Sequence, residues 1–376
     1  MTLRSTRAPL ATLALCSAFA STLALAACGA SNESSSSSSG GSGSSSSAKQ
    51  LTGTLNGAGS SAQQAAIQGW QAGFTKVQPN VTVNYSPIGS GDGRTQFLTG
   101  AVDFAGSDAA LTDDELKKAA DRCGDAGVYE IPAYISAIAV VYHLDGVKDL
   151  NLSADNVAKI FAGSITTWND PAIAKDNPDA KLPSTTITPV HRSDKSGTTK
   201  NFTDYLTKTA ASSWTGGAVD TWPVQGGEGA NQTSGLVQAV QAGNGTIGYA
   251  DESQAQKLGI AKIKVGDSFV APSAEGAAAV VENSEVVSGR GDYDFAYSIN
   301  RTTTDKTEYP LVLVSYHIGC VQNADATQAD LLQAFEGYVI SSAGQDAAKE
   351  QAGSAPLSDK LRKQAQQAVD AISAKK

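Results

Sequence analysis

Apolar positions follow two alternating periods along most of the chain, from Leu51 to the C-terminus. Short apolar and β-branched runs, such as residues 81–85 and 185–191, have the pattern typical of strands. Between such runs, apolar residues recur every three or four positions, as in the segment that begins near Ser61 and stops at Pro79. This alternation of strands with helices predicts a layered α/β fold.

The same two periods place the other elements. Residues 131–142 form an apolar, β-branched run, which predicts a buried strand that could carry the chain into a second domain. Thr112 and Glu115 form a capping box that starts a helix. The remaining predictions are strands at 51–55, 102–105, 246–249 and 311–316, and helices around 153–161, 236–240, 331–340 and 359–372.

Residues 1–27 do not fit this pattern. Arg4 and Arg7 precede an Ala/Leu-rich apolar run, a composition typical of a secretory signal peptide. The run ends in Leu-Ala-Ala-Cys28, which resembles a bacterial lipobox, so we expect lipid on Cys28; the alternative is an ordinary signal peptide with an incidental cysteine. Residues 28–50, rich in Ser and Gly, would then form a flexible tether with a reach of roughly 25 Å.

The formal charge argues against one class of partner. It is −9 for the whole chain and −11 once Arg4 and Arg7 are removed with the signal (−9 − 2). Because the chain is acidic and has no Lys/Arg-rich face, we expect no nucleic-acid partner. A small anion remains a suitable ligand, since local donors outweigh a net charge that is screened beyond about 8 Å.

Two cysteines remain after the signal and the lipid site are set aside. Cys16 lies in the signal, which leaves Cys123 and Cys320. An exported chain meets an oxidising environment, so these two could form a disulfide; the alternative is a pair of buried free thiols. Neither belongs to a CxxC motif or a Cys/His cluster, so no metal site is predicted.

Three loops share one design. Residues 57–62, 89–93 and 194–199 each place Gly with Ser or Thr between a predicted strand and a predicted helix. Glycine allows close backbone approach, a helix start offers free N–H groups, and hydroxyls add uncharged donors. Together the three loops predict a site for a compact tetrahedral oxyanion, although one such loop alone could be an ordinary turn. None has the spacing of a P-loop or of a dinucleotide-binding motif.

Two charged residues refine this prediction. Arg192 precedes the third loop and could contact an oxyanion through two N–H groups. Asp108 follows the predicted strand at 102–105. A carboxylate beside an anion makes sense if the ligand carries a proton that the carboxylate can accept, as monohydrogen phosphate does and sulfate does not. A surface arginine and a helix-capping aspartate are the ordinary alternatives.

Three other classes of function are alternatives to the binding of this oxyanion. Sulfate or molybdate would be a related ligand, but Asp108 argues against both if it faces the site. A hydrolase or phosphatase lacks support, because no GxSxG motif or metal-ligand cluster occurs and only His143, His191 and His317 could act as imidazole bases. A surface adhesin or sensor would rest on the tripeptide that begins at Arg290, Arg-Gly-Asp, which we interpret as chance in a Gly-rich loop.

With these loops and charged residues, the sequence resembles a known family, the phosphate-binding proteins of bacterial ABC phosphate importers. The resemblance runs from about Leu51 to the C-terminus. Its motifs are Gly57-Ala58-Gly59-Ser60, Ile88-Gly89-Ser90-Gly91, Val102-Asp103-Phe104 with Ser107-Asp108, Trp168-Asn169-Asp170, Arg192 with Asp194-Lys195-Ser196-Gly197-Thr198, and Ile247-Gly248-Tyr249.

The resemblance implies a role for each site residue. Asp108 would accept the phosphate proton, Arg192 would form the ion pair, and Asp194 would orient Arg192. Donors to the other phosphate oxygens would come from Ser61, Ala62, Ser90, Ser196, Gly197 and Thr198. Three positions depart from the family pattern. Ser61 replaces a common Thr and keeps the hydroxyl, Ala62 replaces a common Phe, and Lys195 replaces a common Gly.

The resemblance also implies the architecture and the partners. The expected fold is a two-lobed, periplasmic-binding-protein-like (type II) α/β fold with the ligand cleft between the lobes. Lobe I would comprise residues 51–138 and 305–376, and lobe II residues 139–304. The chain would be a monomeric binding protein rather than an enzyme, with no cofactor. It would be anchored outside the cell membrane by lipid and would deliver phosphate to the permease and ATPase subunits of an ABC importer.

Overall fold

The computed structural model describes residues 49–255 and 257–375, which form one compact unit from Lys49 onward. The signal peptide, the lipid site at Cys28 and most of the tether lie outside these described residues. Within them, no helix has both the length and the apolar content needed to cross a membrane.

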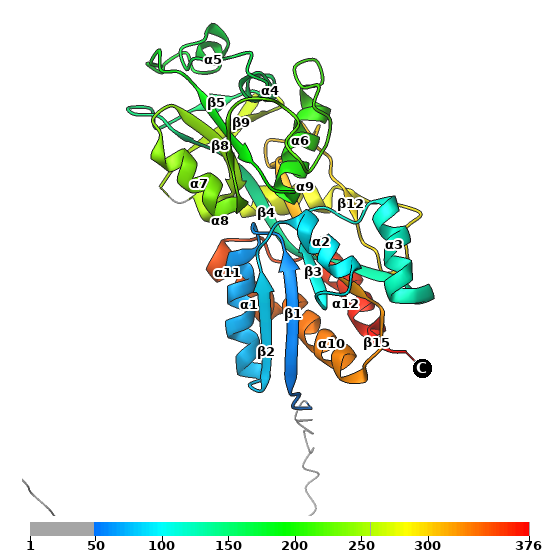
Figure 1. The fold of residues 1–376 in the computed structure, drawn as a ribbon. Coiled ribbons are helices and arrows are strands. Elements are labelled where there is room, and N and C mark those ends of the chain that lie inside the picture. Colours follow the sequence, from blue (N-terminus) through cyan, green and yellow to red (C-terminus); the bar gives the residue numbers. More distant parts are fainter. Residues whose placement is uncertain (1–48, 256, 376) are drawn as a thin grey trace, which may run out of the picture. The chain divides into compact units, whose positions relative to one another are not determined.

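One half of the main sheet includes β1, β2 and β3 (Figure 1). Its strand order is β2, β1, β3, β13 and then the first part of β4. β1 pairs in parallel with β2 and β3, whereas β13 is antiparallel to both β3 and β4. We call this the first half-sheet. Its strands are β1 Gly53–Gly59, β2 Val81–Ser86, β3 Phe104–Ser107, β4 Val128–His143 and β13 Val312–Cys320.

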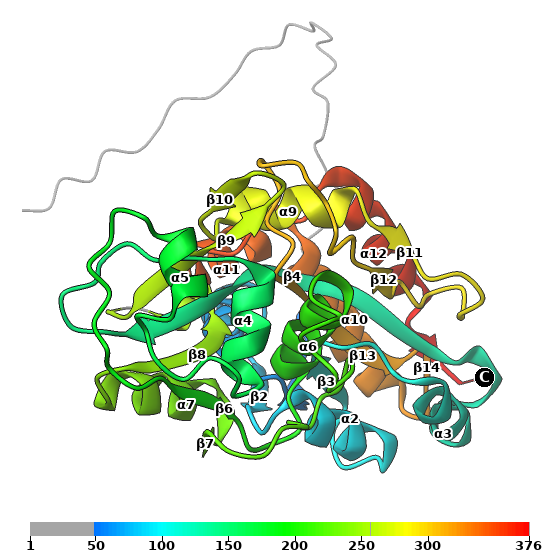
Figure 2. The same ribbon diagram turned by 90° about the horizontal axis from the view of Figure 1, so that it is seen from above.

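The long strand β4 links this half to a second one. Its 16 residues are buried except for the last, and Figure 2 shows the strand extending across both parts of the sheet. Up to Ala137 it pairs with β13, and from Ile138 it pairs with β8 and β9. The second half-sheet therefore consists of residues 138–143 of β4 with β5 Asn151–Leu152, β6 Thr188–Arg192, β7 Glu228–Ala230, β8 Thr246–Asp251, β9 Gly259–Val265 and β10 Ser268–Val270.

Helices pack against both halves and share one apolar core with them. The predicted capping box of Thr112 and Glu115 is present at the start of α3, which confirms that prediction. The helices are α1 Gln64–Val77, α2 Ser90–Leu98, α3 Asp113–Cys123, α4 Ala154–Phe161, α5 Pro171–Asp176, α6 Gly197–Thr209, α7 Gln232–Ala242, α8 Glu252–Ala255, α9 Ala274–Glu282, α10 Ala326–Ile340, α11 Ser342–Ala352 and α12 Asp359–Ala371.

The change of pairing partner along β4 agrees with an architecture of two α/β halves. The predicted α/β class is confirmed by the mixed sheet and its helices. The predicted lobe boundaries at 138/139 and 304/305 stay a prediction, because the described residues from Lys49 onward form a single compact unit.

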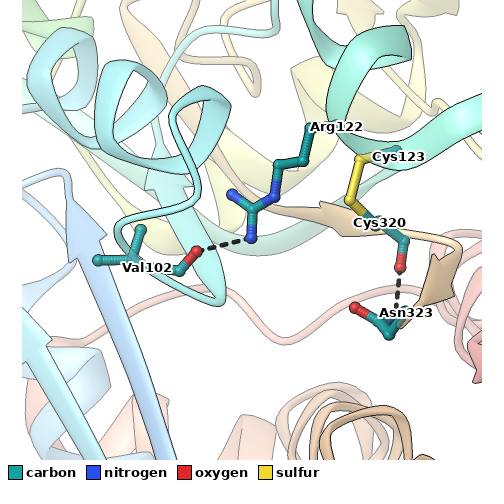
Figure 3. Close-up of a disulfide and its surroundings, with 5 residues drawn as sticks. All are labelled: Val102, Arg122, Cys123, Cys320 and Asn323. Atoms are coloured by element: carbon teal, nitrogen blue, oxygen red, sulfur yellow. Dashed lines mark hydrogen bonds between the residues drawn. A yellow bond between two sulfur atoms is a disulfide. The ribbon is translucent and has the colours of Figure 1, made fainter. Parts of the chain in front are cut away.

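Cys123 and Cys320 form a disulfide (Figure 3). Cys123 ends α3 and Cys320 ends β13, and their Cα atoms lie 5.1 Å apart. The alternative of two free thiols is therefore wrong. Both cysteines belong to the first half-sheet and its helices, and the whole second half-sheet lies between them in the sequence. The disulfide thus closes the first half around an insertion.

Candidate functional site

The starts of four helices meet where the two half-sheets join. Ser61 and Ala62 lie between β1 and α1, Ser90 is the first residue of α2, and Ser196 is the N-cap of α6. The fourth helix start was not predicted: Thr233 lies in the first turn of α7. Helix starts present free N–H groups and the positive end of the helix dipole, so their convergence favours an anion.

Asp108 is buried among these helix starts. Its side chain is 3% exposed. Thr198 Oγ1 donates to Oδ2 over 3.0 Å, and Ser315 Oγ donates to Oδ1 over 2.7 Å. Ser60 also donates a hydrogen bond to this carboxylate. Burial raises the pKa of Asp108, while the three hydroxyls and the charge of Arg192 oppose that rise. The carboxylate is therefore an acceptor in a site otherwise made of donors.

Arg192 is the positive charge of the site and is 2% exposed. Its Nε donates to Asp194 Oδ1 over 2.7 Å and its Nη2 donates to Asp194 Oδ2, which makes a bidentate ion pair. Burial alone would raise the pKa of Asp194, but the hydrogen bonds and charge of Arg192 lower it below its usual value. Nη1 contacts Thr233 Oγ1 at 3.3 Å. Asp194 therefore contacts the guanidinium through two of its nitrogens, and its role in orienting Arg192 toward a ligand stays a prediction.

Three serine hydroxyls of the site share one arrangement. Each oxygen accepts a backbone N–H, so the backbone leaves the hydroxyl hydrogen free; Ser61 Oγ also lies 3.0 Å from Thr233 Oγ1, a contact in which either hydroxyl can donate. Ser61 Oγ accepts from Thr233 N, Ser90 Oγ from Asp108 N, and Ser196 Oγ from Thr199 N, over 3.0–3.2 Å.

Gly197 makes the close approach of two loops feasible. A Cβ at this position would lie 2.5 Å from Ser90 Oγ and 2.7 Å from the Cβ of Asp108. Any larger residue would therefore push the first turn of α6 away from both side chains. Glycine at 197 thus brings the second and third predicted loops together.

Contacts also join the two halves around the site. Gly91 N donates to Lys195 O over 3.1 Å, and Arg94 pairs with Asp220 at 3.1 Å. Gln254, in α8, donates to the carbonyl oxygens of residues 61 and 62. Ser61, which belongs to the first half, contacts Thr233, which belongs to the second. The site is therefore assembled from both halves.

Comparison with known proteins identifies the family. A PBP superfamily domain matches residues 42–343. Phosphate-binding protein PstS 2 of Mycobacterium tuberculosis is 36% identical over 325 residues, which cover 85% of this chain and 87% of that protein. The chain belongs to the phosphate-binding protein family. A PstS protein of Xylella fastidiosa is 34% identical and covers 73% of this chain and 74% of its own length.

Solved structures agree on the fold of this family member. A periplasmic phosphate-binding protein solved with phosphate, PfluDING, has a TM-score of 0.68 and 22% identity, covering 83% of this chain and 92% of its own. A phosphate-binding protein from Stenotrophomonas maltophilia has a TM-score of 0.64 and 19% identity, covering 84% and 93%. The predicted periplasmic-binding-protein-like fold is thus confirmed.

Family membership makes the chain a binding protein rather than an enzyme. The residues considered for the alternative functions, His191 and Arg290, both contact other side chains of the protein. His191 stacks on Trp222 with ring centroids 4.9 Å apart, and its Nδ1 contacts the carbonyl oxygen of Arg192. Arg290 pairs with Glu130 and Asp294. Among residues 49–255 and 257–375, no three His, Cys, Asp or Glu side chains are grouped to hold a metal.

The structure shows where two of the departures from the family pattern, Ala62 and Lys195, are located. Ala62 is completely buried, and its N–H donates to Ser60 Oγ over 3.1 Å. Lys195 is exposed and reaches the second loop through its backbone carbonyl.

Proposed function

We propose that this protein binds inorganic phosphate outside the cell membrane and delivers it to an ABC importer. One observation carries the proposal: hydroxyl donors from both halves surround a buried, oriented Arg192 and a buried acceptor, Asp108. A tetrahedral anion that still carries one proton fits that combination of many donors and one acceptor. The names of the 33–36% identical relatives support the same ligand.

Most phosphate oxygens would be held by donors already in place. Arg192 would supply the charge, and the hydroxyls of Ser61, Ser90 and Ser196 would donate through hydrogens that the backbone leaves free. Other donors are the hydroxyl of Thr198 and the backbone N–H groups of Ala62 and Gly197. Thr198 and Ala62 would exchange their present intramolecular partners, Asp108 and Ser60, for the ligand. Each charge-assisted hydrogen bond contributes about 1.5–3 kcal/mol, so a handful suffices for micromolar binding.

Asp108 would decide which oxyanion is accepted. Monohydrogen phosphate would donate its proton to the carboxylate, whereas sulfate has no proton to donate at neutral pH. Sulfate would therefore leave two buried acceptors facing each other, which can weaken binding by a factor of about 10⁴ or more.

Delivery of phosphate to the importer would depend on closure of the two lobes and on the lipid anchor. Residues 51–138 with 305–376 would close against residues 139–304 around the ion, and the closed form would dock on the permease and ATPase assembly. Removing water on closure strengthens each charged hydrogen bond. Lipid on Cys28 and the tether at 28–50 would keep the monomeric domain near the importer.

Titration calorimetry of the purified protein with phosphate and sulfate tests this function. We expect tight binding of phosphate, no turnover of a phosphate ester, and sulfate binding weaker by at least a hundredfold. Equal affinity for the two anions, or no heat of binding with phosphate, would overturn the proposal.

A further inference from the structure

A row of buried polar side chains leads from Asp108 into the first half-sheet. Ser315 Oγ lies 2.7 Å from Asp108 Oδ1, and Gln63 Nε2 lies 2.9 Å from Ser315 Oγ. His317 Nε2 lies 3.1 Å from Gln63 Oε1. His317 Nδ1 in turn lies 2.7 Å from Glu336 Oε2. We call Ser315, Gln63, His317 and Glu336 the Asp108 relay.

The Asp108 relay is enclosed by protein. All four of its side chains have 0% exposure. The rings of Trp70 and Phe104 each lie 5.2 Å from the His317 ring, centroid to centroid. A Cβ at residue 106 would lie 2.3 Å from Gln63 Nε2, so glycine at that position makes room for the amide. A buried, connected polar network of this kind has a strict pattern of donors and acceptors, because an unpaired member would be strongly destabilising.

The pattern of donors and acceptors fixes the donor-to-acceptor direction of the hydrogen bonds in the Asp108 relay. The Gln63 amide donates to Ser315 Oγ through Nε2, so its Oε1 must accept from His317 Nε2–H. Ser315 has one hydrogen, and Asp108 Oδ1 is the acceptor it meets. At the far end, His317 Nδ1 faces Glu336 Oε2. Each hydrogen bond from His317 onward therefore points toward Asp108.

We propose that the Asp108 relay makes Asp108 an acceptor-only carboxylate and thereby sets the preference for a protonated oxyanion. The relay residues are positioning residues, since they act on the ligand through Asp108. Because Ser315 already accepts from Gln63, its hydrogen is directed to Oδ1 of Asp108, and a hydrogen bond donated to the carboxylate stabilises the ionised form over the protonated one. A protonated Asp108 would be a donor, and a donor would admit sulfate.

The surroundings of Asp108 explain why a hydrogen bond that stabilises its ionised form is needed. Burial raises the pKa of Asp108, which favours the protonated acid. The charged and titratable groups that act on it are Arg192, which opposes that rise, and Tyr85. Hydroxyl donors from Ser60 and Thr198 also lower the pKa, but Thr198 would turn to the ligand when phosphate binds. The Ser315 hydrogen bond is independent of the ligand, so it would hold the carboxylate ionised in both states.

The experiment is calorimetry with phosphate and with sulfate at pH 5.5 and pH 8, on the parent and on Ser315→Ala. We expect the phosphate-to-sulfate affinity ratio to fall at least tenfold in the variant, and further at pH 5.5 than at pH 8. Gln63→Glu is a second variant, because it keeps the side-chain size but places an acceptor where the relay needs a donor. It should lower the ratio in the same way.

Ser284→Ala is the matched control, since Ser284 is a buried serine bonded to Val280 O outside the relay. Its ratio should stay within twofold of the parent. A folded Ser315→Ala with an unchanged ratio at both pH values would overturn the relay, and if that variant fails to fold, Gln63→Glu decides in the same way. The inference rests on the proposed function. A parent that binds no phosphate would overturn both, whereas a selective parent with unaffected variants would overturn the relay alone.

Discussion

At the scale of single residues, two buried charges dominate the site, and each is already paired within the chain. Arg192 is held by Asp194, and Asp108 is held by hydroxyls from three separate segments. Such pairing holds both side chains in position before the ligand arrives, so little reorganisation accompanies binding. The geometry of these two residues matters as much as their charge.

Replacing Arg192 by lysine tests that geometry. Lysine keeps the charge but cannot form a bidentate pair with Asp194 and still reach the ligand and Thr233. We expect Arg192→Lys to weaken phosphate binding at least tenfold in titration calorimetry. Lys195→Ala is the control, because it removes a neighbouring but exposed positive charge. Parental affinity in Arg192→Lys together with weakened binding in Lys195→Ala would mean that net charge, rather than orientation, determines affinity.

Asp251 should make stability depend on pH. Burial raises its pKa to about 7 in the folded protein, from about 4 when exposed. Between these values the folded state binds more protons, so this contribution to the free energy of unfolding is full below about pH 4 and is lost as pH rises through 7. Denaturant titrations of parent and Asp251→Asn should show the parent losing about 1–3 kcal/mol relative to the variant from pH 5 to pH 8. A constant difference would show that Asp251 does not titrate there.

The candidate site residues that the sequence predicts lie in compact local motifs. Ser90 and the segment from Arg192 to Thr198 stand out because glycine, hydroxyl and charge occur together. Thr233, Gln63 and Ser315 were missed, since each is an ordinary residue whose partner lies far away in the sequence: Thr233 contacts Ser61, 172 positions distant. Only the fold brings such pairs together.

At the scale of elements, the site is a convergence of helix starts. Three of them followed from the sequence because a Gly/Ser loop precedes each helix. The fourth, α7, begins with Gln232 at φ 61. The sequence Asn-Gln-Thr does not predict this backbone conformation. Helix α11 was also not predicted, because its buried positions are mainly alanine, glycine and glutamine and give no strong apolar period.

The start of α7 should affect how long the ligand stays bound. Thr233→Val keeps the side-chain shape and the backbone N–H to Ser61, but removes the hydroxyl that contacts both Ser61 and Arg192. We expect phosphate affinity to fall about five- to twentyfold, the effect of losing one hydrogen bond. The fall should come chiefly from faster dissociation, which stopped-flow measurements can detect. Thr246→Val removes another buried threonine hydroxyl, bonded to Val240 O, and should leave dissociation unchanged. If both variants release phosphate at the parental rate, Thr233 has no part in retention.

At the scale of the whole molecule, β4 joins two half-sheets that bring the site together. The α/β class and most elements were predictable, because period and turn signals are local. The pairing order was not: β13, late in the sequence, inserts between β3 and β4 in the first half-sheet. That long-range pairing depends on packing of the complete chain, which no local pattern records.

The disulfide should stabilise the molecule without changing the site. Cys123 and Cys320 both lie in the first half, whereas the ligand residues come from both halves. The double variant Cys123→Ser with Cys320→Ser should lose about 2–5 kcal/mol of unfolding free energy in denaturant titrations. Its phosphate affinity at 25 °C should stay within about threefold of the parent, which calorimetry can check. A large loss of affinity in a folded variant would mean that the disulfide positions the site.

We propose that Asp108 accepts the proton of phosphate and thereby excludes sulfate. The most direct test is competition: phosphate binding is measured by calorimetry with rising sulfate in the parent and in Asp108→Asn. Asparagine has nearly the same shape but can donate to an unprotonated oxygen. We predict that sulfate competes at least tenfold more effectively in the variant. The same competition in both proteins would contradict this account of the site.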